Sequence, residues 1–97
     1  MAIVPYGSST LTCTYSAVLS TTWTSVSDSY YTQRVTVEGI LASDNPIIDL
    51  ITTTSGYEDE QDSWEKIFKA ETSDNAITFY SRKITTVDIT LQIKVVR

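Results

Sequence analysis

Apolar and polar residues alternate along most of this chain, a pattern typical of strands with one dry face and one wet face. The alternation is most regular over residues 87–95, where every odd position is apolar and every even position is polar. Similar runs predict strands at residues 10–18, 30–38 and 47–53, and a hairpin that joins residues 66–72 to residues 77–81. Short strands at this spacing favour a β-sandwich.

The period-two pattern also predicts which side chains share a face, because alternate residues of a strand lie on the same side. Cys13 is expected to be a half-buried packing residue. The residues predicted to share a face are Leu11, Cys13 and Tyr15; Tyr31, Gln33, Val35 and Val37; and Ile48, Leu50 and Thr52. Ile89, Leu91, Ile93 and Val95 are predicted to lie on the core face.

Breaks in the alternation predict the connections. Residues 19–29 are rich in Ser and Thr, and we predict a loop there around Trp23. Asp44-Asn45-Pro46 predicts a turn, because Asp and Asn side chains can bond to their own backbone and proline fixes φ. Residues 1–8 contain Pro5 and Gly7 and are predicted to form a short N-terminal arm.

The acidic run that follows Gly56 predicts the one helix, near residues 57–66, because carboxylates stabilise the first turn of a helix. Tyr57, Trp64 and either Ile67 or Phe68 are expected to share its buried face.

The sequence thus predicts an all-β fold: a single domain over residues 1–97, built as a small antiparallel β-sandwich of five to seven strands with one short helix. A small open barrel is the alternative.

Charge and composition argue against several kinds of partner. The net charge is −5, and the seven basic residues are scattered, so we expect no binding to nucleic acid. A single cysteine excludes an intramolecular disulfide. The start of the chain shows neither a basic segment nor an apolar core of a signal peptide, and no apolar run is long enough to span a membrane. We therefore expect synthesis in a cytosol and no membrane insertion.

The search for catalytic chemistry gives only weak candidates. The chain has no histidine and no glycine-rich phosphate loop. The acidic residues 58–62 lack the glycine and the final glutamate of an EF-hand loop, so a solvated helix start explains them better than a calcium site. Asp44 and Asp49 fit a turn and a strand better than a general acid–base pair. We therefore predict that the protein is not an enzyme and has no cofactor and no metal site.

The aromatic residues are the better candidates for a function. Trp23, Tyr30 and Tyr31 are predicted to form a ligand-stacking site, since aromatic rings can stack on the apolar faces of sugars. Trp64, Phe79 and Tyr80 could extend such a platform. The alternative is that Trp23 and Trp64 fill the core of a chain that has few leucines.

An ordered set of residues runs through the chain: Trp23; Tyr31-Thr32-Gln33, Val35-Thr36-Val37 and Gly39-Ile40; Asp44, Pro46-Ile47 and Asp49; Trp64 and Lys66-Ile67; Ile77-Thr78-Phe79-Tyr80; and Ile93-Lys94-Val95-Val96-Arg97. This order resembles small structural modules of tailed bacteriophages and of prophages of Gram-positive bacteria. Such modules occur alone or at the C-terminal ends of head-fibre, tail-fibre and baseplate proteins. The resemblance covers residues 23–97. It departs from the family at Ile84-Thr85-Thr86, where a proline often precedes the threonine.

The resemblance implies a virion component without catalytic residues, a fibre or capsid-decoration module made in the host bacterial cytoplasm. Its partners would be other virion proteins. Fibre modules of this kind are usually three-fold, so the resemblance also implies a homotrimer. Self-association is expected independently, because a chain this short has a marginal core. The alternative function is a carbohydrate-binding module that uses exposed aromatic residues to bind a host cell-surface glycan.

Overall fold

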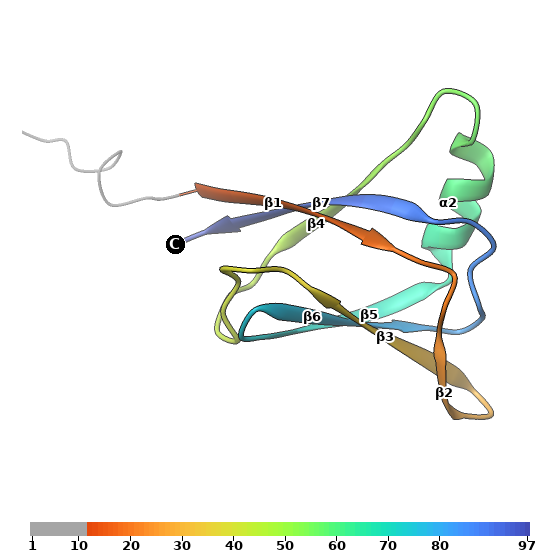
Figure 1. The fold of residues 1–97 in the computed structure, drawn as a ribbon, viewed down its shortest axis with the longest axis horizontal. Helices are drawn as coiled ribbons and strands as arrows, with labels where there is room; N and C mark the ends of the chain where they lie inside the picture. Colours follow the sequence, from red (N-terminus) through yellow and green to blue (C-terminus); the bar gives the residue numbers. More distant parts are fainter. Residues whose placement is uncertain (1–11) are drawn as a thin grey trace, which may run out of the picture.

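The computed structural model describes residues 12–97, whose strands form two antiparallel sheets packed face to face (Figure 1). One sheet has three strands in the order β1-β7-β4, and the other has four in the order β2-β3-β6-β5. The predicted all-β sandwich with one short helix is confirmed for this part of the chain. The elements are β1 (Thr12–Leu19), β2 (Thr24–Ser27), β3 (Tyr30–Thr36), β4 (Ile47–Ile51), α2 (Tyr57–Glu65), β5 (Ile67–Ser73), β6 (Ala76–Ser81) and β7 (Ile89–Val96). The predicted arm and Leu11 lie outside the described residues.

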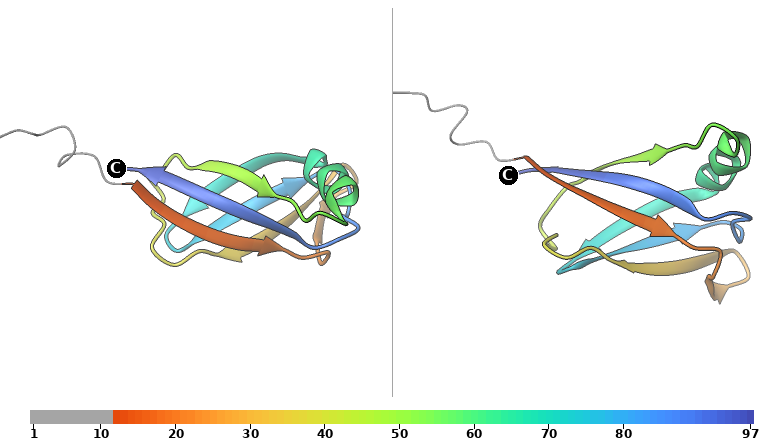
Figure 2. Two further views of the ribbon diagram at one scale, coloured as in Figure 1. Left: turned by 90° about the horizontal axis from the view of Figure 1, so that it is seen from above. Right: turned by 45° about the horizontal axis from the view of Figure 1, so that its top comes forward.

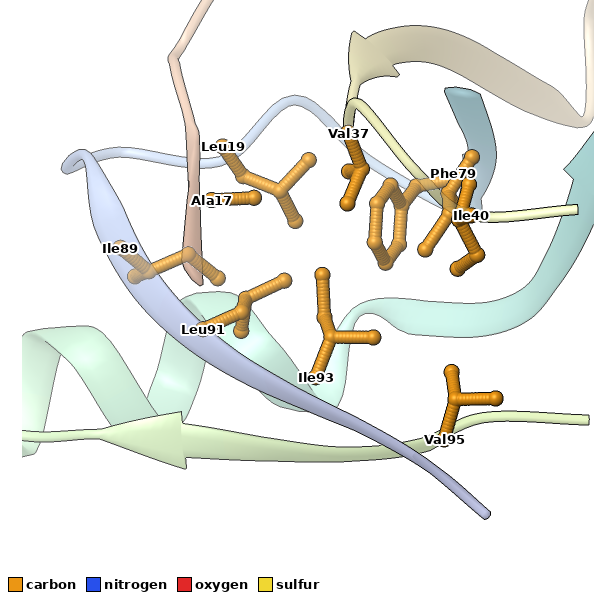
Figure 3. Close-up of a cluster of buried hydrophobic side chains, with 10 residues drawn as sticks. Ala17, Leu19, Val37, Ile40, Phe79, Ile89, Leu91, Ile93 and Val95 are labelled. Atoms are coloured by element: carbon orange, nitrogen blue, oxygen red, sulfur yellow. The ribbon is translucent and has the colours of Figure 1, made fainter. Parts of the chain in front are cut away.

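The core lies between the two sheets, and β7 supplies its largest share. Its odd-numbered residues are all buried, as the alternation predicts. β7 is the central strand of its sheet, so both of its edges are hydrogen-bonded and one face is dry. Figure 3 shows these side chains meeting those of β1, the segment after β3 and β6. The core residues are Ala17, Leu19, Val37, Ile40, Ile77, Phe79, Ile89, Leu91, Ile93 and Val95.

The polar groups near this core are paired with one another. Gln33 shares a face with Val35, as predicted, and this face points inward. The Gln33 amide bonds the backbone of Ser20 in both directions: Ser20 N donates to Oε1 at 2.9 Å, and Nε2 donates to Ser20 O at 3.0 Å. Trp23 Nε1 donates to Thr85 Oγ1 at 2.9 Å. Thr85 is buried in the linker before β7 and also donates to Ser20 O. These bonds satisfy groups that would otherwise be costly to bury.

The prediction that residues 19–29 form a loop is wrong at both ends. Leu19 is the last residue of β1, and its side chain is fully buried. Residues 24–27 form β2, a short edge strand that pairs with β3 and contains an irregularity between Ser25 and Ser27. All four residues of β2 are exposed, so no apolar alternation marks the strand in the sequence.

The helix has nearly the predicted bounds, and its predicted buried face is correct for Trp64 and Ile67, which pack against the core. It is wrong for Tyr57, which is 47% exposed, and Phe68, the alternative to Ile67, is 43% exposed. The buried helix residues are the polar Glu60 and Ser63, and Glu60 Oε1 accepts hydrogen bonds from Thr53 N at 2.7 Å and Thr53 Oγ1 at 3.0 Å. Polar contacts therefore help Trp64 to hold the helix in place.

Figure 2 shows α2 at one end of the sandwich, between the end of β4 and the start of β5. The C-terminus lies at the opposite end, beside the start of β1, where Thr12 pairs with Val96. No helix among residues 12–97 is long and apolar enough to cross a membrane.

Candidate functional site on the four-stranded sheet

The outer face of the four-stranded sheet carries a group of three aromatic residues, of which Phe68 is exposed and Tyr30 and Tyr80 are half-buried. Thr32 of β3 pairs with Tyr80 of β6, and both neighbours of Tyr80 along β6 are buried, so Tyr80 faces outward. Tyr30 lies two residues before Thr32 and faces the same way, with its ring 5.9 Å from that of Tyr80 between centroids. Alternation along two adjacent strands thus brings two tyrosines together.

A β-bulge adds the third ring. Ile67 pairs with the buried Ser81 and packs against the core, whereas Lys69 pairs with Tyr80 on the outer face. Phe68 is the extra residue between these pairs, and a bulge of this kind redirects the side chain it carries. Its ring lies 6.2 Å from that of Tyr30 in an edge-to-face arrangement. We call Tyr30, Phe68 and Tyr80 the aromatic triad.

Two cations and one carboxylate surround the aromatic triad. Lys69 Nζ lies 4.7 Å from the centroid of the Tyr80 ring, and the Arg82 guanidinium lies 4.5 Å from that of Phe68. Both distances are within the range of cation–π attraction. Glu71 accepts a hydrogen bond from the Tyr80 hydroxyl and forms an ion pair with Lys69 at 3.3 Å. The rings are therefore held in fixed positions by groups on neighbouring strands.

The Glu71–Tyr80 hydrogen bond shifts both groups in the expected directions. It lowers the pKa of Glu71, with a further contribution from the bond to Lys69. It raises the pKa of Tyr80 above 10.0, because ionisation would remove the donated proton and place two negative charges side by side. Tyr80 therefore remains a neutral donor at physiological pH, and Glu71 remains an ionised acceptor.

The three residues predicted to form a stacking site are not brought together. Tyr30 belongs to the aromatic triad. Trp23 packs against the core and donates to Thr85, so it is half-buried. Tyr31 pairs with Ser81, whose side chain is fully buried, so it lies on the face opposite to Tyr30. Of the other aromatic residues named from the sequence, Phe79 and Trp64 contribute to the core, and Tyr80 joins the triad.

The carboxylates considered for chemistry have structural partners or lie apart. Asp44 is buried and forms a bidentate pair with Arg97, in which Nε donates to Oδ1 at 3.1 Å and Nη2 to Oδ2 at 2.6 Å. The hydrogen bond from Arg97 lowers the pKa of Asp44. Asp49 is exposed on β4. In the helix, Asp62 pairs with Lys66 at 3.4 Å. Residues 12–97 contain no group of three or more potential metal ligands.

A groove of about 430 Å³ opens between β4 of one sheet and β5 of the other, beside residues 44–46. Its size is at the small end of the range of ligand pockets. Ile48 and Ile77 supply its apolar wall, and Glu71 lies on its rim, so the groove adjoins the sheet that carries the aromatic triad. The lining residues are Asp44, Asn45, Pro46, Ile48, Ala70, Glu71, Thr72 and Ile77.

The sequence did not identify three site residues, Phe68, Lys69 and Arg82, because an alternating pattern does not predict a β-bulge. The only signal is the pair Ile67-Phe68, two consecutive large apolar residues where the pattern expects one.

No family model, no curated protein and no solved structure matches this chain.

Proposed function

We propose that this chain is a non-enzymatic structural module of a tailed-phage virion, of the fibre or capsid-decoration kind, whose attachment surface is the outer face of the four-stranded sheet. The observation that carries the proposal is the partly exposed aromatic triad with its neighbouring cations and carboxylate. Clustered apolar surface often marks an interaction site, and tyrosine and arginine are enriched among the residues that dominate binding energy.

The virion role is supported by the residues on which the resemblance rests. Gly39, Asp44 and Arg97 belong to that ordered set, and they meet at one corner of the fold: Arg97 Nη2 donates to Gly39 O at 2.8 Å and also binds Asp44. Residues far apart in the sequence are thus joined by hydrogen bonds to the same arginine side chain. A signature built from structural contacts fits a module that works by holding its shape and presenting a surface.

The ligand that fits the aromatic triad best is a carbohydrate on the host surface. Pyranose rings have an apolar face that stacks on aromatic side chains, and their hydroxyls can bond to charged groups at the edge. The same surface could attach the virion to a cell without any catalytic step. Attachment through many copies compensates for the weak affinity of each site.

The other sheet provides a surface for a second copy of the chain. Its outer face exposes four apolar side chains and two opposite charges, Lys94 and Asp49, which form no ion pair among residues 12–97. A neighbouring copy could cover the apolar residues and pair the two charges. We propose a homotrimer assembled through this face. The apolar residues are Val18, Ile47, Ile51 and Val96, exposed by 53%, 59%, 45% and 60%.

Mass spectrometry of purified virions tests whether the protein is part of the particle.

Binding of the purified chain to an array of host-type glycans tests the attachment surface. We expect the chain to bind at least one glycan, and we expect Tyr30→Ala and Tyr80→Ala to abolish that binding. Thr14→Ala, on the outer face of the other sheet, is the matched control. Binding that survives both tyrosine substitutions would contradict the proposed surface.

A further inference from the structure

The charge around the aromatic triad is opposite in sign to that of the whole molecule. The chain has a net charge of −5. On the outer face of the four-stranded sheet, however, Arg34, Lys69 and Arg82 are accompanied by one carboxylate, Glu71. Arg34 pairs with Thr78, whose neighbours Ile77 and Phe79 are buried, so Arg34 faces outward like Tyr80. The aromatic triad therefore lies in a locally positive region of an acidic protein.

Two of these cations have no carboxylate partner. Lys69 is paired with Glu71, but neither Arg34 nor Arg82 forms an ion pair within residues 12–97. The Arg82 guanidinium lies over the Phe68 ring, which holds the side chain in place but does not neutralise its positive charge. Arg34 is two positions along β3 from Thr32, the residue that pairs with Tyr80, or about 7 Å along the strand. The two free guanidinium groups thus lie on either side of the rings.

A free guanidinium group is well suited to bind a planar or tetrahedral anion, because its parallel N–H donors match the oxygens of a carboxylate or a phosphate. Exposed aromatic rings are suited to bind a sugar ring. A ligand that satisfies both features carries a saccharide unit and an anionic group a few ångströms from it.

We propose that the aromatic triad, Arg34 and Arg82 form a binding site for an anionic polysaccharide. One sugar ring stacks on Tyr30, because the plane of the Tyr80 ring is inclined by 40° to it and Lys69 lies over Tyr80. A carboxylate or phosphate on a neighbouring unit binds Arg82 or Arg34. This inference rests on the proposed attachment function and specifies its ligand.

A nucleic acid has aromatic and anionic groups too, but it fits less well. Its affinity depends on neutralising many phosphates at once, and each neutralised phosphate requires a cation. This surface offers two unpaired cations, on a molecule with twelve carboxylate side chains that would repel a long phosphate chain. An anionic glycan needs only one or two charged contacts beside a stacked ring.

The test measures binding of the full chain to matched pairs of glycans. One pair is a polygalacturonate hexasaccharide and its carboxyl-reduced form, and the other is phosphomannan and neutral mannan. The two pairs separate a carboxylate from a phosphate as the anion. We expect binding to at least one anionic member to be about tenfold tighter than to its neutral partner, and to weaken as salt is added. A single-stranded oligothymidylate is included as the competing class.

Variants identify the groups responsible. Combined Arg34→Gln and Arg82→Gln should remove the preference for the anionic member and leave any binding of the neutral member intact. Lys66→Gln, which removes a charge that is paired with Asp62 at the end of the helix, should change nothing. Equal binding of both members of each pair would overturn this inference while leaving the attachment surface in place. Binding of the oligonucleotide alone would overturn the ligand class, and binding of no glycan would contradict the proposed attachment function as well.

Discussion

Individual residues hold the connection from β3 to β4 in one conformation. Gly39 has φ +98°, a conformation that other residues rarely adopt, and an added Cβ would lie 3.1 Å from the Tyr15 hydroxyl. Asn75, in the turn between β5 and β6, has φ 64° and accepts a hydrogen bond from Gly39 N at 2.9 Å through its side chain. Its backbone N donates to Ile40 O at 2.8 Å. The turn of one hairpin therefore fixes the path between the two sheets.

Replacing Gly39 by Ala should destabilise the fold by about 1–2 kcal/mol, because the positive φ becomes strained and the new methyl group crowds Tyr15. Urea unfolding followed by tryptophan fluorescence measures the change. Glu38→Ala, the exposed neighbour, serves as the control and should stay within about 0.5 kcal/mol of the wild type. Equal effects at the two positions would show that the backbone conformation of Gly39 does not matter.

Asp44 makes the stability depend on pH. Its pKa is lowered in the folded state by the hydrogen bond from Arg97, so folding favours the ionised carboxylate. The contribution is complete above the ordinary value of 3.8 and is lost as the pH falls through the lower folded value. Glu71, whose pKa is also lowered, acts in the same direction. We therefore expect the protein to be less stable at about pH 2.5 than at about pH 6, with the loss confined to the range below the ordinary pKa values of 3.8 and 4.5.

The Asp44→Asn variant should be less stable at about pH 6 and should lose less stability on acidification than the wild type. Arg97→Gln should have a similar effect, and the double variant should be little worse than either single one, because both substitutions break the same pair. Urea midpoints at the two pH values measure this. An unchanged pH dependence in Asp44→Asn would assign the acid sensitivity to other carboxylates.

Among the elements, β7 and its buried face could be predicted from the sequence, whereas strand β2 and the bulge in β5 could not. A central strand with one dry face must alternate strictly, and β7 does so. β2 could not be recognised, because an exposed edge strand needs no apolar residues. The place of Phe68 depends on a bulge, and the pair of Asp44 with Arg97 joins residues 53 positions apart. Local patterns carry no information on such long-range contacts.

Leu91 and Thr90 test the two faces of β7. Leu91 is fully buried, and its replacement by Ala should cost about 2–4 kcal/mol through lost burial and the cavity left behind. Thr90 is exposed on the outer face, and its replacement by Ala should change stability by about 0.5 kcal/mol or less. Chemical denaturation of both variants gives the comparison. Similar losses at the two positions would contradict the assignment of Leu91 to the core face and of Thr90 to the outer face.

At the scale of the whole molecule, the sandwich has two different outer faces. The four-stranded sheet presents the aromatic triad and a positive region, and the three-stranded sheet presents exposed apolar residues with one charge of each sign. Because the sheets are stacked, these faces point in opposite directions (Figure 1). A module that assembles through one face keeps the other free to bind a ligand.

We therefore expect the protein to self-associate, and the resemblance to three-fold fibre modules predicts a mass of about three times 10.8 kDa at micromolar concentration. Ile47→Glu places a charge in the proposed contact and should shift the equilibrium to the monomer. Thr36→Glu, on the outer face of the other sheet, should leave the assembly intact. Sedimentation equilibrium measures the mass. A mass of 10.8 kDa at all concentrations would reject self-association and favour a monomeric decoration protein.

We propose that this chain is a module of the virion, and electron microscopy of purified particles tests whether it is. Virions from the bacterium that carries the sequence are labelled with gold-conjugated antibody fragments raised against the purified chain. We predict label at one recurring position on each particle, on the head, the tail or the baseplate. Label that is absent from intact particles, with the protein found only in the unassembled fraction of the lysate, would contradict the claim.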